Sequence, residues 1–131
     1  MDAQTYLTDT HLRLTVSPVV LAYAVMEERC GIDYGYLRVQ VELTNHDFVE
    51  MAEYFVVQTD VITVQRYRYQ WMDAARQTFK KRWDNARHHP HLKNFPHHVH
   101  DGDESNVVTG RAMRMIDVIK YLEDTIDRSS P

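Results

Sequence analysis

The chain has 131 residues, 44% of them hydrophobic and 11% aromatic, with a formal net charge of −4. This length predicts one domain over residues 1–131, and the composition argues against a disordered chain. Cys30 is the one cysteine, which excludes an internal disulfide and a cysteine-based zinc framework. Since no apolar run reaches membrane-spanning length, we expect a cytoplasmic protein with no membrane partner.

The first half of the chain predicts one helix and three strands. Apolar residues at helical spacing predict a short amphipathic helix over 5–14, which Pro18 ends. The apolar run 19–29 predicts a largely buried strand. Residues 36–43 alternate apolar and polar side chains, which is typical of a half-buried strand in an antiparallel sheet. Residues 48–57 fit a helix or a strand, and the short turns around them favour a strand.

The second half predicts two further strands, a long loop and a closing helix. Residues 61–72 alternate and residues 76–83 follow a short turn, so both predict strands. Two prolines and the lack of periodicity predict a loop over 84–102, and such loops are usually functional. An apolar stripe from Val108 to Ile126 predicts a helix. We therefore predict an α+β fold: a curved five-stranded antiparallel meander, with a short N-terminal helix and a C-terminal helix packed on it.

Charge is divided unevenly along the chain. Residues 61–100 hold eight lysines and arginines against two acidic residues, a net charge of +6, and the remainder carries −10. This division predicts a basic surface on an acidic body, suited to phosphate groups or to an acidic partner. A basic hairpin that only faces solvent gives the same pattern, so both interpretations remain open.

Six of the eight histidines fall within residues 88–100, on the predicted loop. Neutral imidazole is the commonest metal ligand, so His89, His98 and His100 are candidate ligands of Zn²⁺ or Ni²⁺. However, no carboxylate lies in a familiar zinc motif, and we expect no cofactor beyond adventitious binding of these ions. Some of the histidines must be structural, because no active site uses six.

Metal-free cleavage of RNA is a further chemistry that this segment can carry. Attack by the ribose 2′-hydroxyl needs a base, an acid and cations beside the phosphate. Asp84 would orient a histidine and Asn85 would start a turn, although a plain Asx-turn explains this pair equally well. The candidate acid–base residues are His88, His97, His98 and His100.

Arginines and tyrosines alternate on the predicted fourth strand. Tyr67 and Tyr69 lie between and beside Arg66 and Arg68, which combines stacking surfaces with charge, as in proteins that bind single-stranded nucleic acid. In the alternative, these aromatic side chains face the core and the arginines face water. The candidate substrate-binding residues are Arg66, Arg68, Tyr67, Tyr69, Arg82 and Arg87.

The segment 82–101 resembles the signature of the TumE-like toxin family, small prokaryotic proteins encoded in type II toxin–antitoxin modules. The shared pattern is Arg-aromatic-Asp-Asn-Ala-x-His-His, a short spacer, then Phe-Pro-His-His-x-His, and His91 lies in the variable spacer. Residues 66–71 also resemble the family's Arg/Tyr-rich strand. The matching residues are Arg82, Trp83, Asp84, Asn85, Ala86, His88, His89, Phe95, Pro96, His97, His98 and His100.

The resemblance implies a growth-inhibiting toxin and a cognate antitoxin, typically of helix-turn-helix type, but not a mechanism. Together with the charge and the histidines, it favours a metal-independent ribonuclease that uses loop histidines for acid–base catalysis on an RNA substrate. Two alternatives remain: a non-catalytic module whose basic face binds nucleic acid or protein, and a metal-dependent hydrolase using the histidine-rich loop. The sequence leaves open whether the protein is an enzyme and whether it forms a homodimer.

Overall fold

The first element is helix α1 (Ala3–Val16), which is longer at both ends than the predicted helix. Asp2 caps it, since its carboxylate accepts a hydrogen bond of 2.8 Å from the backbone N–H of Thr5. The computed structural model describes residues 1–126. No helix in this part of the chain is long and apolar enough to cross a membrane.

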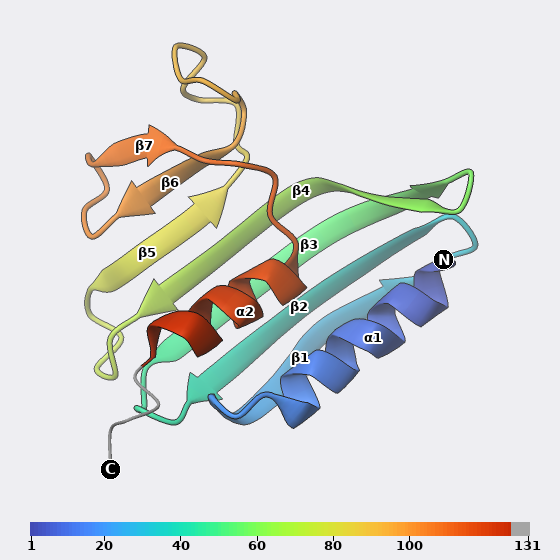
Figure 1. The fold of residues 1–131 in the computed structure, drawn as a ribbon, viewed down its shortest axis with the longest axis horizontal. Helices are drawn as coiled ribbons and strands as arrows, with labels where there is room; N and C mark the ends of the chain where they lie inside the picture. The colour runs from blue at the N-terminus through green and yellow to red at the C-terminus, as the bar shows by residue number, and fades with distance from the viewer. Residues whose placement is uncertain (127–131) are drawn as a thin grey trace.

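A seven-stranded antiparallel sheet follows, in which each strand pairs with the next along the chain. A second helix, α2 (Met115–Thr125), comes after the last strand, and Figure 1 shows both helices on the same side of the sheet. The predicted α+β class and the meander are confirmed, but the prediction of five strands is wrong, and the sheet is open. The strands are β1 (Val20–Cys30), β2 (Tyr34–Leu43), β3 (Phe48–Gln58), β4 (Val61–Met72), β5 (Phe79–Asp84), β6 (His98–Asp101) and β7 (Val107–Thr109).

The two extra strands lie in segments predicted as loop and helix. β6 pairs with β5, so His98 and His100 lie on a strand rather than on a loop. β7 pairs with β6 and includes Val108, and the C-terminal helix begins only at Met115. Strands of four and three residues are too short to show a period, which is why the sequence pattern missed them.

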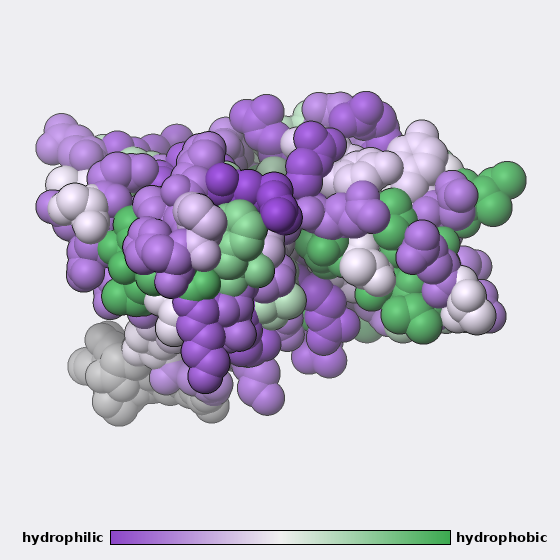
Figure 2. Space-filling view, turned by 90° about the horizontal axis from the view of Figure 1, so that it is seen from above, coloured by the Kyte–Doolittle hydropathy of each residue, from purple (hydrophilic) through white to green (hydrophobic). Residues whose placement is uncertain are grey.

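The sequence predicted that strand β1 is largely buried, but in the structure it is mostly exposed. It pairs with β2, and Leu21 and Met26 are 55% and 48% exposed. Register shifts after Val20 and after Val25 interrupt its alternation, so apolar residues turn away from the core. Figure 2 shows the molecule of Figure 1 from above. The surface in this view is mostly hydrophilic, with hydrophobic residues in several separate groups.

The core lies between the two helices and one face of the sheet. Alternate residues of β2, β3 and β4 point into it. The alternation was predicted for β2 and β4, but in β4 a register shift beside Gln65 changes which residues face the core. The face of the sheet opposite the helices is therefore left without a helix to cover it. The largest fully buried side chains of these strands are Leu37, Leu43, Met51, Phe55 and Tyr69.

One carboxylate lies in this core and joins four elements. Glu53 of β3 is 1% exposed and accepts hydrogen bonds from the hydroxyls of Tyr6 and Tyr69, at 2.6 and 2.9 Å. It also accepts from the backbone N–H of Met115 at 2.7 Å, at the start of α2. Burial raises the pKa of Glu53 above its ordinary value of 4.5. The side chain thus holds α1, β4 and α2 against β3.

Candidate functional site

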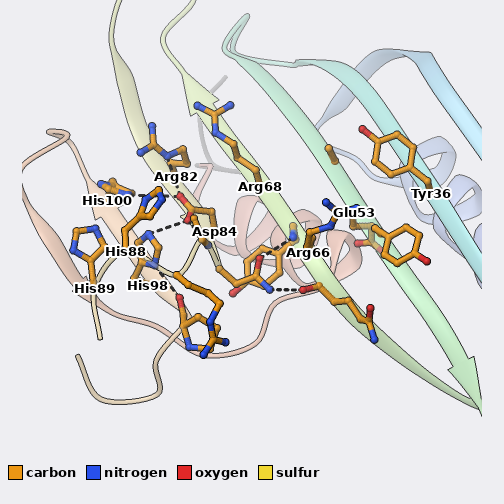
Figure 3. A pocket seen from close by; sticks show the side chains of 18 of the residues that line it. Tyr36, Glu53, Arg66, Arg68, Arg82, Asp84, His88, His89, His98 and His100 are labelled. Atoms are coloured by element: carbon orange, nitrogen blue, oxygen red, sulfur yellow. Dashed lines mark hydrogen bonds and ion pairs between the residues drawn. The ribbon is translucent and has the colours of Figure 1, made fainter. Parts of the chain in front are cut away.

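A pocket of about 1190 Å³ lies on the sheet face opposite the helices (Figure 3). Cross-strand register explains its composition, since directly paired residues of an antiparallel sheet share a face. Arg68 pairs with Asp84, and Asp84 pairs with His98; likewise Arg82 pairs with His100. The side chains around the pocket include Arg29, Tyr36, Tyr54, Arg66, Arg68, Arg82, Asp84, Arg87, His88, His89, His98, His100 and Glu104.

Asp84 is the centre of the hydrogen-bond network in this pocket, and it is 5% exposed. Its Oδ1 lies 2.9 Å from Nε2 of His98 and accepts from the backbone N–H of Ala86 at 3.0 Å. Its Oδ2 accepts from Nε of Arg82 at 3.2 Å and lies 3.6 Å from Nε2 of His100. The two alternatives predicted for Asp84 therefore coexist: it orients a histidine and forms an Asx-turn.

The other ring nitrogens of these two histidines face backbone carbonyls. Nδ1 of His98 lies 2.9 Å from the oxygen of Pro96, and Nδ1 of His100 lies 3.0 Å from that of Glu104. A neutral imidazole has one N–H, yet each ring is flanked by two acceptors once the Asp84 carboxylate is counted. Acceptors on both sides of each ring therefore fix the orientation of the two buried histidines.

His89 and His88 are more accessible members of the same cluster, and both line the pocket. The ring centroid of His89 lies 4.8 Å from that of His98, 5.9 Å from that of His100 and 6.4 Å from that of His88. Desolvation, followed by the positive charges of neighbouring histidines, lowers the pKa of His89 below 6.5. Its ring is thus neutral at pH 7, with a lone pair able to accept a proton. The sequence had indicated His89 only as a metal ligand.

The histidine cluster also has the donor set of a transition-metal site. His89, His98 and His100 each offer a ligand atom, and these atoms lie within 4.8 Å of one another. With metal–ligand bonds of about 2.1 Å, adjacent ligand atoms lie roughly 3.0–3.4 Å apart. The oxygens of Asp84, at 2.9 and 3.6 Å from the two buried histidines, fall near that range. His89, His98 and His100 are therefore candidate ligands of a divalent transition metal, with Asp84 beside the two buried histidines.

Two predicted catalytic residues have other partners. His97 does not line the pocket; its ring stacks on that of Tyr67 at 5.8 Å, and Nδ1 lies 2.9 Å from the tyrosine hydroxyl. Desolvation lowers the pKa of His97 below 6.5. Asn85 lines the pocket, but its amide accepts from the backbone N–H of Tyr67 and donates to the carbonyl of Gln65. Asn85 therefore extends the backbone pairing beyond β5.

Tyr67 and Tyr69 face the core, which is the second of the two interpretations of this strand. In this orientation their rings cannot stack on a base. They are 5% and 0% exposed, because β4 turns its odd-numbered residues toward the helices after the register shift beside Gln65. Before that shift the even-numbered Ile62 and Val64 pack against the core. Tyr67 is among the residues that line the pocket but is buried, and the half-buried aromatic residues of the lining are Tyr36 and Tyr54. The alternation of residues 36–43 already placed Tyr36 opposite the core-facing leucine and valine side chains, so the sequence held a signal for it.

The four predicted arginines all line the pocket, but they are not equally available. Arg66 and Arg68 are exposed on β4 and point along the open sheet face. Arg82 is engaged, since it donates to Asp84 and to both carboxylate oxygens of Glu104. The guanidinium carbon of Arg87 lies 4.7 Å from the ring centroid of Phe95.

Part of the basic segment 61–100 lies away from the pocket. Lys80 donates a hydrogen bond of 2.6 Å to Asp47, and its ammonium also lies 5.1 Å from the ring centroid of Trp71. Lys81 donates to the hydroxyl of Tyr121 on α2 at 3.0 Å. The positive charge predicted for one surface is therefore divided, and the arginines carry the part that reaches the pocket.

Comparison with known proteins agrees with the resemblance drawn from the histidine segment. Residues 8–128 match the protein family described as Toxin TumE. No curated protein and no solved structure matches the chain. The family match spans nearly the whole chain, well beyond the twenty residues that carry the histidines. The chain therefore belongs to the Toxin TumE family, the toxin components of toxin–antitoxin modules.

Proposed function

We propose that this toxin is a metal-independent ribonuclease in which His89 is the general base and His88 the general acid. The observation that carries the proposal is the position of His89 beside the buried pair His98 and His100, in a pocket lined by arginines. A general base must be accessible and unprotonated at the working pH, and the position of His89 and its lowered pKa both support this role.

The pocket and an RNA strand together supply every group that the reaction needs. The ring of His89 takes the proton of the ribose 2′-hydroxyl, and the 2′-oxygen bonds to the adjacent phosphorus. The bond from phosphorus to the 5′-oxygen then breaks as His88 donates a proton to that oxygen. The products are a 2′,3′-cyclic phosphate and a 5′-hydroxyl. Arg66 and Arg68 stabilise the negative charge on the phosphorane oxygens.

His98, His100 and Asp84 act in this proposal as positioning residues. They are 2%, 5% and 5% exposed, and their polar atoms already have partners within the protein. Their role is to hold in place the loop that carries His89. The sequence indicated His98 and His100 as acid–base residues, whereas this proposal assigns that role to the accessible His88 and His89.

The test is cleavage of RNA by the purified toxin and by two variants. His89→Ala should lower the cleavage rate by about 10²–10⁴, the usual contribution of a general base. His91→Ala is the matched control, because His91 lies on the same loop but does not line the pocket. Equal rates for wild type and His89→Ala would refute the assignment. RNA binding without cleavage by wild type would favour the binding-module alternative.

A second candidate is a metal-dependent hydrolase, which the convergence of His89, His98, His100 and Asp84 favours. A metal held there would polarise a phosphate oxygen or activate a water. The candidates differ in their response to a chelator. Cleavage that survives EDTA supports the metal-independent reaction, whereas loss in EDTA with recovery on adding Zn²⁺ or Mn²⁺ supports the hydrolase.

Family membership implies a cognate antitoxin as partner. We propose one of the helix-turn-helix type, in line with the resemblance of residues 82–101 to the signature of such modules. Co-expression with the product of the neighbouring gene should abolish growth inhibition. Size-exclusion chromatography of the toxin alone and of the pair would then report the stoichiometry, including any homodimer.

A further inference from the structure

A row of two neighbouring tyrosines flanked by two arginines crosses the open sheet face beside the histidines. Arg29 of β1 pairs with Tyr36 of β2, Tyr36 pairs with Tyr54 of β3, and Tyr54 pairs with Arg66 of β4. The guanidinium carbon of Arg29 lies 4.9 Å from the ring centroid of Tyr36. The guanidinium carbon of Arg66 lies 5.3 Å from the ring centroid of Tyr54. All four side chains line the pocket.

The two tyrosine rings are placed differently from the core tyrosines. Tyr36 and Tyr54 are half-buried and lie on the face without helices, whereas Tyr69 is 0% exposed and binds Glu53. Directly paired residues have Cβ atoms about 5 Å apart, so Tyr36 and Tyr54 lie side by side on this face, and the ring centroid of Tyr54 also lies 6.2 Å from that of Tyr34. In Figure 3, Tyr36 lies across β4 from the histidine cluster, with Arg66 between them.

The row is adjacent to the proposed reaction centre. Arg66 and Arg68 are two residues apart on one face of β4, a separation of about 7 Å along the strand. Arg68 belongs to the next row, which continues through Asp84 to His98. The pocket of about 1190 Å³ that contains both rows exceeds the roughly 300–1,000 Å³ that suits one drug-sized ligand. It therefore has room for more than one nucleotide.

We propose that Tyr36 and Tyr54 are a stacking platform for unpaired bases, and that the substrate of the proposed ribonuclease is therefore single-stranded RNA. This inference rests on the proposed function for the identity of the ligand. Arg29 and Arg66 hold the rings and neutralise the phosphates of the stacked nucleotides, and Arg68 leads the backbone to the histidines. Stacking on an aromatic ring accepts any base, so the row selects single strands rather than a particular sequence.

The test is binding of a fluorescein-labelled single-stranded 2′-O-methyl oligonucleotide, followed by fluorescence anisotropy. This probe has no free 2′-hydroxyl and cannot be cleaved by the proposed reaction. Tyr36→Ala and Tyr54→Ala should each weaken binding about fivefold or more, while Tyr36→Phe and Tyr54→Phe should bind like wild type. Arg38→Ala is the matched control, because Arg38 lies two residues from Tyr36 on the same face but does not line the pocket.

Salt dependence separates stacking from charge. A tyrosine that stacks releases no counterion, so Tyr54→Ala should lower affinity at every salt concentration and keep the slope of log affinity against log salt. Arg66→Ala should instead flatten that slope by about one. A duplex of the same sequence should bind more weakly and respond to neither tyrosine variant, because its bases are already stacked.

Three results would contradict the proposed stacking platform. They are wild-type affinity in both Ala variants, an equal loss of affinity for duplex and single strand, and a loss of affinity in the Phe variants. Tyr36→Leu, which keeps apolar volume without an aromatic face, decides the matter if an Ala variant does not fold. Failure of the ribonuclease proposal gives a different result. In that case wild-type protein would not cleave RNA, yet the tyrosine variants would still lose affinity for the uncleavable strand.

Discussion

Asp84, at the end of β5, and His98, at the start of β6, lie opposite each other with 2.9 Å between Oδ1 and Nε2. Both side chains are almost fully buried. Fourteen positions separate them in the sequence, and the loop between them carries His88 and His89. The contact therefore closes this loop over the pocket and fixes the accessible histidines beside the arginines.

The Asp84→Asn substitution tests the role of that carboxylate. Asparagine keeps the shape and can still accept from the backbone N–H of Ala86, but it removes the negative charge facing the two buried histidines. We expect a loss of about 1–3 kcal/mol in the free energy of unfolding and a lower RNA cleavage rate, with the fold retained. Chemical denaturation and a cleavage assay measure these effects, and the exposed Asp103→Asn is the control. Unchanged stability and rate would contradict the central place given to Asp84.

His98→Ala should damage stability as well as activity. It leaves the buried Asp84 carboxylate without its closest partner, and loss of a hydrogen bond to a buried polar group costs about 1–3 kcal/mol. Thermal unfolding should therefore shift well below that of wild type, whereas His91→Ala should shift little. Loss of toxicity in His98→Ala alone would not identify a catalytic residue. A His98→Ala protein as stable as wild type would show that the buried pair is not the support described above.

The pH dependence of cleavage reports the state of His89. Its pKa is lowered below 6.5, so the neutral, proton-accepting form is lost only as the pH falls through that lowered value. The rate at limiting substrate should therefore rise with pH through an acid limb below 6.5 and then level off with respect to this group. His91→Ala should keep the limb in place. An acid limb centred at or above 6.5 would argue against His89 as the base.

Glu53 makes stability depend on pH in the opposite direction from a surface carboxylate. Its folded-state pKa is raised, so its contribution is fully present below the unfolded pKa and is lost as the pH rises through the folded value. Glu53→Gln mimics the protonated form and should reduce this dependence, while Glu53→Ala should destabilise at every pH by about 1–3 kcal/mol. Denaturation of the three proteins across pH gives the comparison. Identical pH profiles for wild type and Glu53→Gln would contradict the assignment.

The two available arginines should control RNA affinity, and Lys80 should not. Arg66→Glu and Arg68→Glu should weaken binding more at low salt than at high salt, because screening already reduces such contacts. Lys80→Glu is a control from the same basic segment, since its ammonium is bound to Asp47 outside the pocket. Equal loss at all salt concentrations would indicate misfolding. A Lys80→Glu effect as large as that of Arg68→Glu would place the binding surface elsewhere.

Much of the fold could be predicted from local patterns, and much of the site could not. Residues 36–43 and 61–72 alternate over many positions, which is enough to identify strands β2 and β4 and the buried face of β2. Strands β6 and β7 are too short to show alternation, and in β1 two register shifts break the link between apolar sequence and burial.

The site depends on cross-strand register, which no local pattern contains. The histidine motif indicated a segment that lines the pocket, with Asp84 as a partner. Only the pairing of β5 with β6 shows that His98 and His100 are buried and that His97 faces the other way. The same limit applied to the tyrosines of β4. Their alternation with arginines does not show whether the tyrosines or the arginines face the core. Burial by the two helices decides it, and this burial is a tertiary effect.

The most direct test of the central claim is the chemistry of the ends that the purified toxin leaves on RNA, determined in the presence of EDTA. Acid–base catalysis by His89 and His88 predicts fragments with 2′,3′-cyclic phosphate and 5′-hydroxyl ends, formed at the same rate with and without the chelator. Fragments with 5′-phosphate ends, or cleavage that stops in EDTA, would contradict it.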